Sequence, residues 1–213
     1  MNWNIVKGAC LALLPVAGTL KAQEKPNIVV ILADDLASNE ISCYGGKNLK
    51  TPNIDRIAEE GIRFTNNFAS CAMSVPIRAS LYTGLYPARH GSYQNHKISY
   101  SDIKSVTYYL PQAGYRVGRA GKTHTVPKSV FNFEKVPGFE ENCIAVTADY
   151  TVDGIRDFMR QDSPFCLFVC STLSHAPWTC GNKDEFDADK VILPPNCVDN
   201  KGTRELFRRL LAE

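Results

Sequence analysis

The sequence predicts an α/β fold in which a mixed, mostly parallel β-sheet is flanked by helices. Three segments have the features of its strands and end in polar residues: 27–35 (NIVVILADD), 115–122 (YRVGRAGK) and 164–175 (PFCLFVCSTLSH). The first and third are continuous apolar runs, which are typical of parallel strands buried on both faces. Segments with helical features separate the strands, and this alternation indicates a layered α/β domain.

The composition fits one globular domain. The chain has 213 residues, of which 44% are hydrophobic and 22% are charged, enough for a single domain with a real core. The formal net charge is only +2, which indicates neither a basic stripe nor an acidic tail. We therefore expect no nucleic-acid partner.

Residues 1–22 have the pattern of a secretory signal peptide. Lys7 precedes an apolar run from about residue 8 to residue 20, and the segment has a cleavage point near Ala22. The run is too short to favour a membrane-spanning helix, so we expect an exported protein with no transmembrane segment. A lipoprotein anchored at Cys10 and a buried N-terminal helix are the less favoured alternatives.

The clearest helix signal covers residues 51–61 (TPNIDRIAEEG). Thr51 can cap its start, Pro52 suits its first turn and Gly61 suits the position just past its end. The face that we expect to be buried is formed by Ile54, Ile57 and Ala58.

Further helices are expected over 76–82, 105–113, 151–161 and the last segment, 203–213. Pro111 should kink the helix over 105–113 or delay its start. One face of the last helix should be formed by Leu206, Leu210 and Leu211.

The cysteines do not suggest a disulfide framework. Removal of the signal peptide would leave seven, an odd number. Cys166 and Cys170 lie in an apolar run and are expected to be buried as small hydrophobic residues. Because no C-x-x-C pair occurs, a structural zinc site is not favoured.

Polar groups gather where the three strands end. Asp34 and Asp35 follow the first strand, Lys122 and His124 follow the second, and His175 follows the third. Because the carboxyl ends of parallel strands share one edge of the sheet, we expect these side chains to lie together. Each alone has a plainer interpretation, as a loop cap, a solvated charge or a structural histidine. Their joint occurrence at strand ends is what indicates a site.

One further stretch, SCAMSVPIRASLYTG (70–84), offers two candidate reactive residues, Cys71 and Ser74. The S-x-P-x-R pattern that begins at Ser74 is a weak signal when taken alone. It gains weight from the strand-end groups, which lie both before and after it in the sequence.

Together these motifs resemble the N-terminal part of type I sulfatases, in the alkaline-phosphatase-like superfamily. The opening P-N-I-V-x-I-x-x-D-D is matched by residues 26–35, and G-K-x-H by 121–124. The signature C/S-x-P-x-R followed by x4-T-G is matched by Ser74, Pro76, Arg78, Thr83 and Gly84. Cys71 does not fit, because Met73 stands where the signature has proline. The resemblance covers about residues 25–213 and implies the N-terminal catalytic domain of that fold.

The resemblance implies chemistry at Ser74. In this family the residue is oxidised to formylglycine by a separate maturation enzyme that reads the proline and the arginine. A serine there resembles bacterial sulfatases matured by a radical enzyme before export, which implies the periplasm. It also implies one calcium ion, bound by Asp34, Asp35 and the group at position 74.

The family further implies a role for each remaining site residue. Arg78 would hold the formylglycine hydroxyl, and Lys122 and His175 would bind sulfate oxygens or protonate the leaving oxygen. His124 would orient the nucleophile or assist expulsion of sulfate. His96 could face the sugar, although a plain loop histidine is an equal alternative.

The substrate implied is a sulfated glycan. RASLYTGLYPARHG and GKTHTVPKSVFNFE look most similar to the sulfamidase-type branch, which cleaves N-sulfate from glucosamine. Two alternatives stay open. One is a phosphate or phosphonate monoester hydrolase of the same superfamily, with Ser74 unmodified. The other is a truncated, non-catalytic product that binds sulfated glycan weakly through Arg78, Lys122 and His175.

One departure from the family matters. Its remaining calcium ligands and a further active-site lysine lie downstream of the region matched here, and this sequence stops at Glu213. Three oxygen donors fall short of the 6–8 that calcium takes. We therefore expect a fragment with weak metal affinity, little activity, marginal stability and exposed apolar edges.

Overall fold

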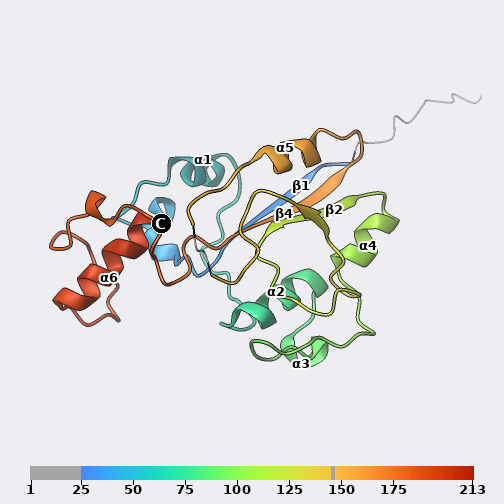
Figure 1. Ribbon diagram of the computed structural model, residues 1–213, viewed down its shortest axis with the longest axis horizontal. Helices are drawn as coiled ribbons and strands as arrows, with labels where there is room; N and C mark the ends of the chain where they lie inside the picture. Colours follow the sequence, from blue (N-terminus) through green and yellow to red (C-terminus); the bar gives the residue numbers. More distant parts are fainter. Residues whose placement is uncertain (1–24, 145–146) are drawn as a thin grey trace, which may run out of the picture.

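The computed structural model describes residues 25–144 and 147–213. The predicted signal peptide, 1–22, lies outside the described residues. Four strands form one sheet in the order β1 (Ile28–Ala33), β4 (Phe165–Ser171), β2 (Arg116–Gly121) and β3 (Glu134–Val136). Every pair of neighbours is parallel, and helices lie on both sides of the sheet (Figure 1). The predicted α/β class and its three strands are confirmed, whereas the short strand β3 was not expected.

The strand order explains where polar groups collect. In the register, Ala33 of β1 lies beside Ser171 of β4, and Gly121 of β2 lies beside Cys170. The pairing continues past the strands, because Asp34 N–H donates to the Ser171 carbonyl at 3.1 Å and Lys122 N–H to the Cys170 carbonyl at 3.0 Å. The carboxyl ends of three strands therefore meet at one edge, as the sequence predicts.

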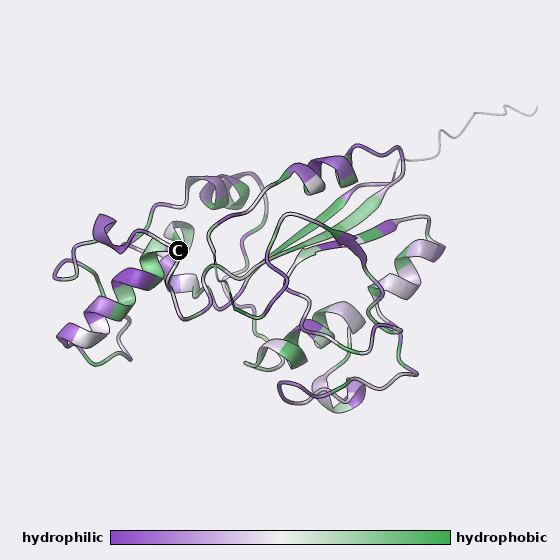
Figure 2. Cartoon of the chain, in the orientation of Figure 1, coloured by the Kyte–Doolittle hydropathy of each residue, from purple (hydrophilic) through white to green (hydrophobic). Residues whose placement is uncertain are grey.

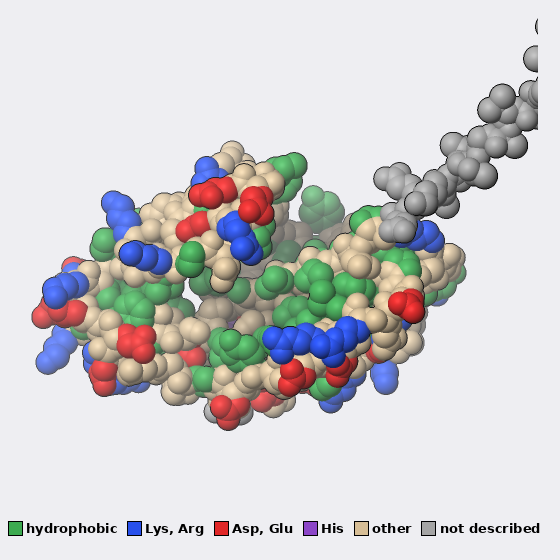
Figure 3. Space-filling model, turned by 90° about the horizontal axis from the view of Figure 1, so that it is seen from above, with side chains coloured by type: hydrophobic (Ala, Val, Ile, Leu, Met, Phe, Trp, Pro, Cys, Tyr) green, Lys and Arg blue, Asp and Glu red, His purple; other side chains and the backbone are tan. Residues whose placement is uncertain are grey.

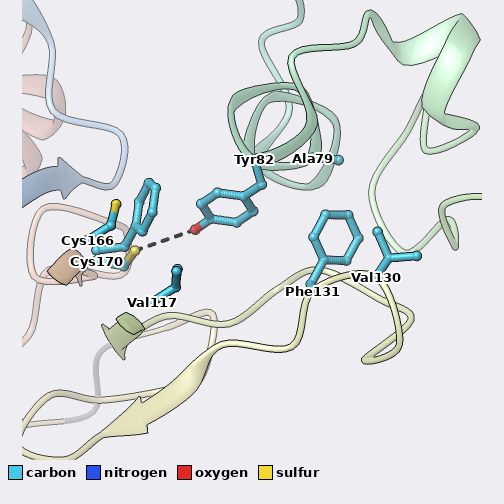
Figure 4. Packing of buried hydrophobic residues seen from close by; sticks show 8 residues of the cluster. Ala79, Tyr82, Val117, Val130, Phe131, Cys166 and Cys170 are labelled. Atoms are coloured by element: carbon cyan, nitrogen blue, oxygen red, sulfur yellow. Dashed lines mark hydrogen bonds between the residues drawn. The ribbon is translucent and has the colours of Figure 1, made fainter. Parts of the chain in front are cut away.

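Strand β4 is the centre of the core. On one face of the sheet, Phe168 and Cys170 pack with Tyr82 of helix α2 (Ser74–Thr83). Figure 4 shows the Tyr82 hydroxyl pointing toward the sulfur of Cys170. On the other face, Phe165 and Leu167 pack with Phe158 of helix α5 (Asp153–Met159). Cys166 and Cys170 are 2% and 0% exposed, which confirms their prediction as buried residues. Figure 2 shows hydrophobic residues along β1 and β4.

The remaining helices are α1 (Pro52–Glu60), α3 (Pro87–His90), α4 (Val106–Gln112) and α6 (Lys201–Ala212). Single 3-10 turns occur at Ser38–Glu40, Ser42–Tyr44 and Lys183–Glu185. Helices α2, α3 and α4 lie on one side of the sheet and α5 lies on the other (Figure 1). Among the described residues, none of these helices combines the length and the apolar character needed to cross a bilayer.

Two predicted helix details are wrong in part: the delayed start of one helix and the place of Leu206 on the buried face of another. Helix α4 begins at Val106, where Ser105 Oγ accepts from Thr107 N–H, so Pro111 in its last turn does not delay it. In α6, Phe207 and Leu211 are the buried residues, and Leu206 is 51% exposed. The helix meets Val191 with its Phe207 side, and Leu206 is turned about 100° away from that side.

The predicted ends of α1 are correct, whereas its predicted cap and its predicted buried face are wrong. Pro52 begins the helix and Gly61 follows its end. Thr51, however, does not cap the helix, because its hydroxyl hydrogen-bonds the side chains of Ser42 and Asp55 instead.

The expected buried face of α1 is largely bare. Ile54 and Ile57 are 39% and 62% exposed, and only Ala58 is half-buried. The neighbouring strand β1 is an edge strand, and its Val29 and Ile31 are also exposed. Figure 3, which views the molecule from the side of α1 and α5, shows hydrophobic side chains at the surface there. The expectation of exposed apolar edges is confirmed for the described residues.

Candidate active site

A buried carboxylate stands at the centre of the strand-end group. Asp34 Oδ1 accepts from Arg78 Nη2 at 2.9 Å, and its Oδ2 accepts from Lys122 Nζ. Asp34 is 6% exposed, Arg78 4% and Lys122 0%. Burial alone would raise the pKa of Asp34, but the hydrogen bonds from Lys122 and Arg78 outweigh it and lower that pKa. Asp34 is therefore ionised, and its charge is balanced inside the protein by two cations.

Ser74 lies beside this group because of helix geometry. It is the first residue of α2, and Arg78 lies one turn further on the same face. Arg78 Nε donates to Ser74 Oγ at 3.2 Å while its Nη2 reaches Asp34. The S-x-x-x-R spacing thus lets one guanidinium join the serine to the carboxylate at the end of β1.

His124 completes the surroundings of Ser74. Its Nδ1 lies 3.3 Å from Ser74 Oγ, and its backbone is left-handed, with φ at 36°. Desolvation, followed by the positive charge of Lys122, lowers the pKa of His124 to about 4. The imidazole is therefore neutral near pH 7.

Two buried polar atoms next to Ser74 have no hydrogen-bond partner within the described residues. They are Arg78 Nη1 and His124 Nε2. An unsatisfied buried group costs about 1–3 kcal/mol, and more when it is charged. Because one of the two is a cationic donor, the arrangement is suited to an anionic, hydrogen-bonding ligand beside Ser74.

The other predicted residues lie at the margin of this group. Asp35 is exposed, with φ at 61°, and its Oδ2 is 3.6 Å from His175 Nε2. His96 is exposed, with φ at 65°, and its ring centre is 5.6 Å from that of His124. The structure thus brings Asp34, Ser74, Arg78, Lys122 and His124 into one hydrogen-bonded group. Asp35 with His175, and His96 against His124, flank it.

The residues expected to bind calcium fit that ion in part. Asp34, Asp35 and Ser74 supply hard oxygen atoms, which calcium prefers. Both oxygens of Asp34 already accept hydrogen bonds from cations, and no cluster of three or more His, Cys, Asp or Glu side chains suited to a metal occurs among the described residues. The described residues therefore supply some of the oxygen ligands that calcium needs, but not a complete set.

One residue of the site has no signal in the sequence. Asn95 Oδ1 accepts from Val75 N–H, next to Ser74, at 3.0 Å. Asn95 belongs to a loop twenty residues downstream, and neither its type nor its spacing marks it. Only the folded loop brings it to the start of α2. Cys71 has no hydrogen bond to Arg78 or His124 among those of the described residues, so the contacts centre on Ser74.

Comparison with known proteins gives a consistent result. Residues 26–191 match the family described as Sulfatase. Over 161 residues the chain is 38% identical to the ulvan-active sulfatase of Formosa agariphila, covering 73% of this chain and 31% of that protein. Over 185 residues it is 34% identical to human N-sulphoglucosamine sulphohydrolase, covering 82% of this chain and 36% of that protein. The chain thus spans about a third of the length of these relatives.

A solved structure has a similar fold. It is a complex with its substrate, D-glucosamine-2-N,6-O-disulfate, and it superposes with a TM-score of 0.67 at 27% identity. The similarity covers 81% of this chain and 40% of that one.

Proposed function

The chain belongs to the sulfatase family, and on this premise we propose that the protein hydrolyses sulfate groups of sulfated glycans at Ser74. The observation that carries the proposal is the group in which Arg78 bridges Ser74 and Asp34. Beside it, a free guanidinium nitrogen and a histidine nitrogen offer contacts to an anion. In the reaction, water adds across the S–O or S–N bond. Sulfate leaves, and the glycan oxygen or nitrogen takes a proton.

The substrate class that we propose is a sulfated sugar, as an ester or an N-sulfate. Relatives named for ulvan and for N-sulphoglucosamine support it, as does the solved complex with a glucosamine disulfate. The exported, periplasmic location inferred from residues 1–22 would suit such a polymeric substrate.

Ser74 itself is proposed to be converted to formylglycine. This step oxidises the –CH2OH side chain to –CHO by removal of two protons and two electrons, so it needs a two-electron oxidant, which a separate maturation enzyme would supply. We propose the radical type, acting before export. Pro76 and Arg78 stand at the positions that such an enzyme reads in the family.

Calcium is proposed as the cofactor, with Asp34, Asp35 and position 74 among its ligands. When bound, it would neutralise substrate charge and favour ionisation of a hydroxyl at position 74. The chain's own residues have separate tasks. Arg78 would bind an anionic oxygen through its free Nη1, and Lys122 would keep Asp34 ionised and fixed. His124 Nδ1 is near enough to take a proton at position 74, and His175 would serve the leaving group.

The test is mass analysis of position 74 combined with paired assays. The protein is produced together with a radical maturation enzyme. We expect the peptide that holds Ser74 to lose two hydrogens, and aryl sulfate or N-sulfated glucosamine to be hydrolysed. Ser74→Ala should abolish turnover, whereas the matched control Cys71→Ala should leave it unchanged.

The alternatives give different results in the same assays. Faster hydrolysis of an aryl phosphate by protein with unmodified Ser74 would indicate a phosphomonoesterase and overturn the proposal. Absence of all turnover, together with no calcium binding in a calorimetric titration, would indicate a non-catalytic product.

A further inference from the structure

The loop from Gly91 to Tyr100 is fixed to the protein by a buried polar network. Ser92 Oγ donates to the Lys97 carbonyl at 3.0 Å and shares a 2.8 Å hydrogen bond with Ser99 Oγ. Ser92 and Ser99 are 0% and 4% exposed. Tyr100 N–H donates to the His90 carbonyl at 3.0 Å, which closes the base of the loop. The tip, residues 93–97, is therefore held in one place although most of it is exposed.

The tip reaches the first turn of helix α2. The first N–H groups of a helix have no partner within the helix, and a side-chain oxygen at the N-cap usually satisfies one of them. In α2 the N-cap residue is Met73, which has no such oxygen. Pro76 carries no N–H, and Ile77 N–H donates to the Met73 carbonyl at 3.1 Å. Asn95 Oδ1 supplies the missing acceptor for Val75 from outside the helix.

The residue after Asn95 touches the other neighbour of Ser74. The ring of His96 stands edge-on to the ring of His124, whose Nδ1 is 3.3 Å from Ser74 Oγ. His96 adopts a φ of 65°, a conformation that costs a non-glycine residue free energy and persists only where the surroundings hold it. Two consecutive loop residues thus contact two neighbours of Ser74, the backbone of Val75 and the ring of His124.

We propose that Asn95 is a positioning residue for the reaction at Ser74. By accepting from Val75 N–H, it fixes the first turn of α2 and with it the direction of the side chain at position 74. It also places His96 against His124, so the histidine keeps its distance to that side chain. This inference rests on the proposed function for its effect on catalysis, whereas the contact between loop and helix stands independently of it.

The proposal predicts that loss of the Asn95 side chain affects turnover more than substrate binding. Misplacement of a reacting group lowers the rate more than it weakens binding of a distant part of the substrate. For Asn95→Ala we expect kcat to fall roughly tenfold, with KM changed by less than about twofold. The Val75 amide should exchange with solvent about fivefold faster, as expected for the loss of a helix cap.

Asn95→Asp is the conservative variant. It keeps an oxygen at Oδ1, so slow exchange of the Val75 amide and kcat should both return to near the wild-type values. Its added negative charge should raise KM for an anionic substrate. A plain structural role for Asn95 would not produce this division between kcat and KM.

The matched control is Gln94→Ala, a change in the same exposed tip. Among the hydrogen bonds of the described residues, the Gln94 side chain makes none. We expect this variant to match the wild type in Val75 exchange, kcat and KM. The fraction of position 74 that is modified, measured by mass, should be equal in all variants.

The experiment uses the protein produced with its maturation enzyme. Equal Val75 exchange in Asn95→Ala and Gln94→Ala, or failure of Asn95→Asp to restore slow exchange, would overturn the inference. If the wild type has no sulfatase activity, the proposed function fails. The exchange measurement then still decides whether Asn95 fixes the start of α2.

Discussion

Strand β1 and the residue that follows it lie in two very different environments only three residues apart. Asp34, just past its carboxyl end, is 6% exposed and receives hydrogen bonds from both Arg78 and Lys122. Ile31, within the strand, is 67% exposed. The polar end of the strand is thus satisfied by the chain's own residues, whereas the side formed by Val29 and Ile31 is largely exposed.

The comparison shows that the charged site and the apolar face of the sheet depend on different contacts, the first on charge partners and the second on burial. The charges of the site come from β1, α2 and the end of β2, which all lie within the described chain. The exposed side of β1 and the outer face of α1 bury little apolar surface, and burial of one such side chain is worth about 1.5–3 kcal/mol. We therefore expect the site to be locally rigid in a domain of modest stability.

The largest effect should come from breaking the charge balance of the site. Lys122→Met leaves Asp34 buried with one cation instead of two, and loss of a partner from a buried ion group costs about 3–5 kcal/mol. Urea unfolding should show this loss of stability. Arg160→Ala, which removes an exposed pair with Asp157, is the control and should cost less than about 1 kcal/mol. A similar loss of stability in both variants would contradict the inference that Lys122 balances the buried charge of Asp34.

A smaller effect is expected from His90, the last residue of α3, which lies on the same side of the sheet as α2 (Figure 1). His90 is 0% exposed, its Nδ1 accepts from Ser92 N–H, and its Nε2 hydrogen-bonds Ser80. Burial lowers the pKa of His90 below its ordinary value of 6.5. The unfolded chain therefore takes up a proton on this group at a higher pH than the folded chain does.

The sign of the resulting pH dependence follows. The stability contributed by His90 is complete above pH 6.5 and is lost as the pH falls from 6.5 towards the lowered pKa. Urea midpoints measured between pH 7.5 and pH 5 should fall less in His90→Gln than in the wild type. His124 contributes in the same direction in both proteins and cancels in the difference. Equal slopes would show that His90 carries no such linkage.

The smallest effect is expected on the bare face. Ile57→Lys in α1 should change the free energy of unfolding by less than about 0.5 kcal/mol, because the side chain is 62% exposed. Leu167→Ala in β4 is the matched core change, and it should cost about 2–5 kcal/mol because Leu167 is 0% exposed. If Ile57→Lys destabilises the protein as strongly as Leu167→Ala does, this face is covered in solution.

Much of the fold could be predicted because its signals are local. Continuous apolar runs marked β1 and β4, and the polar residues that follow β1, β2 and β4 placed Asp34, Lys122 and His175 at one edge of the sheet. Strand β3 was missed because Glu134–Val136 is short and mostly polar, with no periodicity to detect. The face of α1 was predicted wrongly because a helical pattern reveals which side is apolar and cannot reveal what covers it.

The residues of the site could likewise be predicted only in part from the sequence. Ser74 and Arg78 were linked by the S-x-P-x-R signature alone, because the helix was expected over 76–82, and the structure begins it at Ser74, one turn before Arg78. Asn95 could not be found, because its contact depends on the path of a loop held by Ser92 and Ser99. A side chain that acts through tertiary structure leaves no periodic signal in the sequence.

The place of β4 in the sheet also sets an order of events during synthesis. This strand lies between β1 and β2, although it follows both in the chain. Until residue 171 has left the ribosome, the sheet cannot close over α2, where Val75, Pro76 and Arg78 are buried in the finished fold. At about 5–20 residues per second, the stretch from Ser74 to the end of β4 takes roughly 5–20 s to emerge. During that time the residues around Ser74 are open to solvent, and they become buried only when the central strand takes its place.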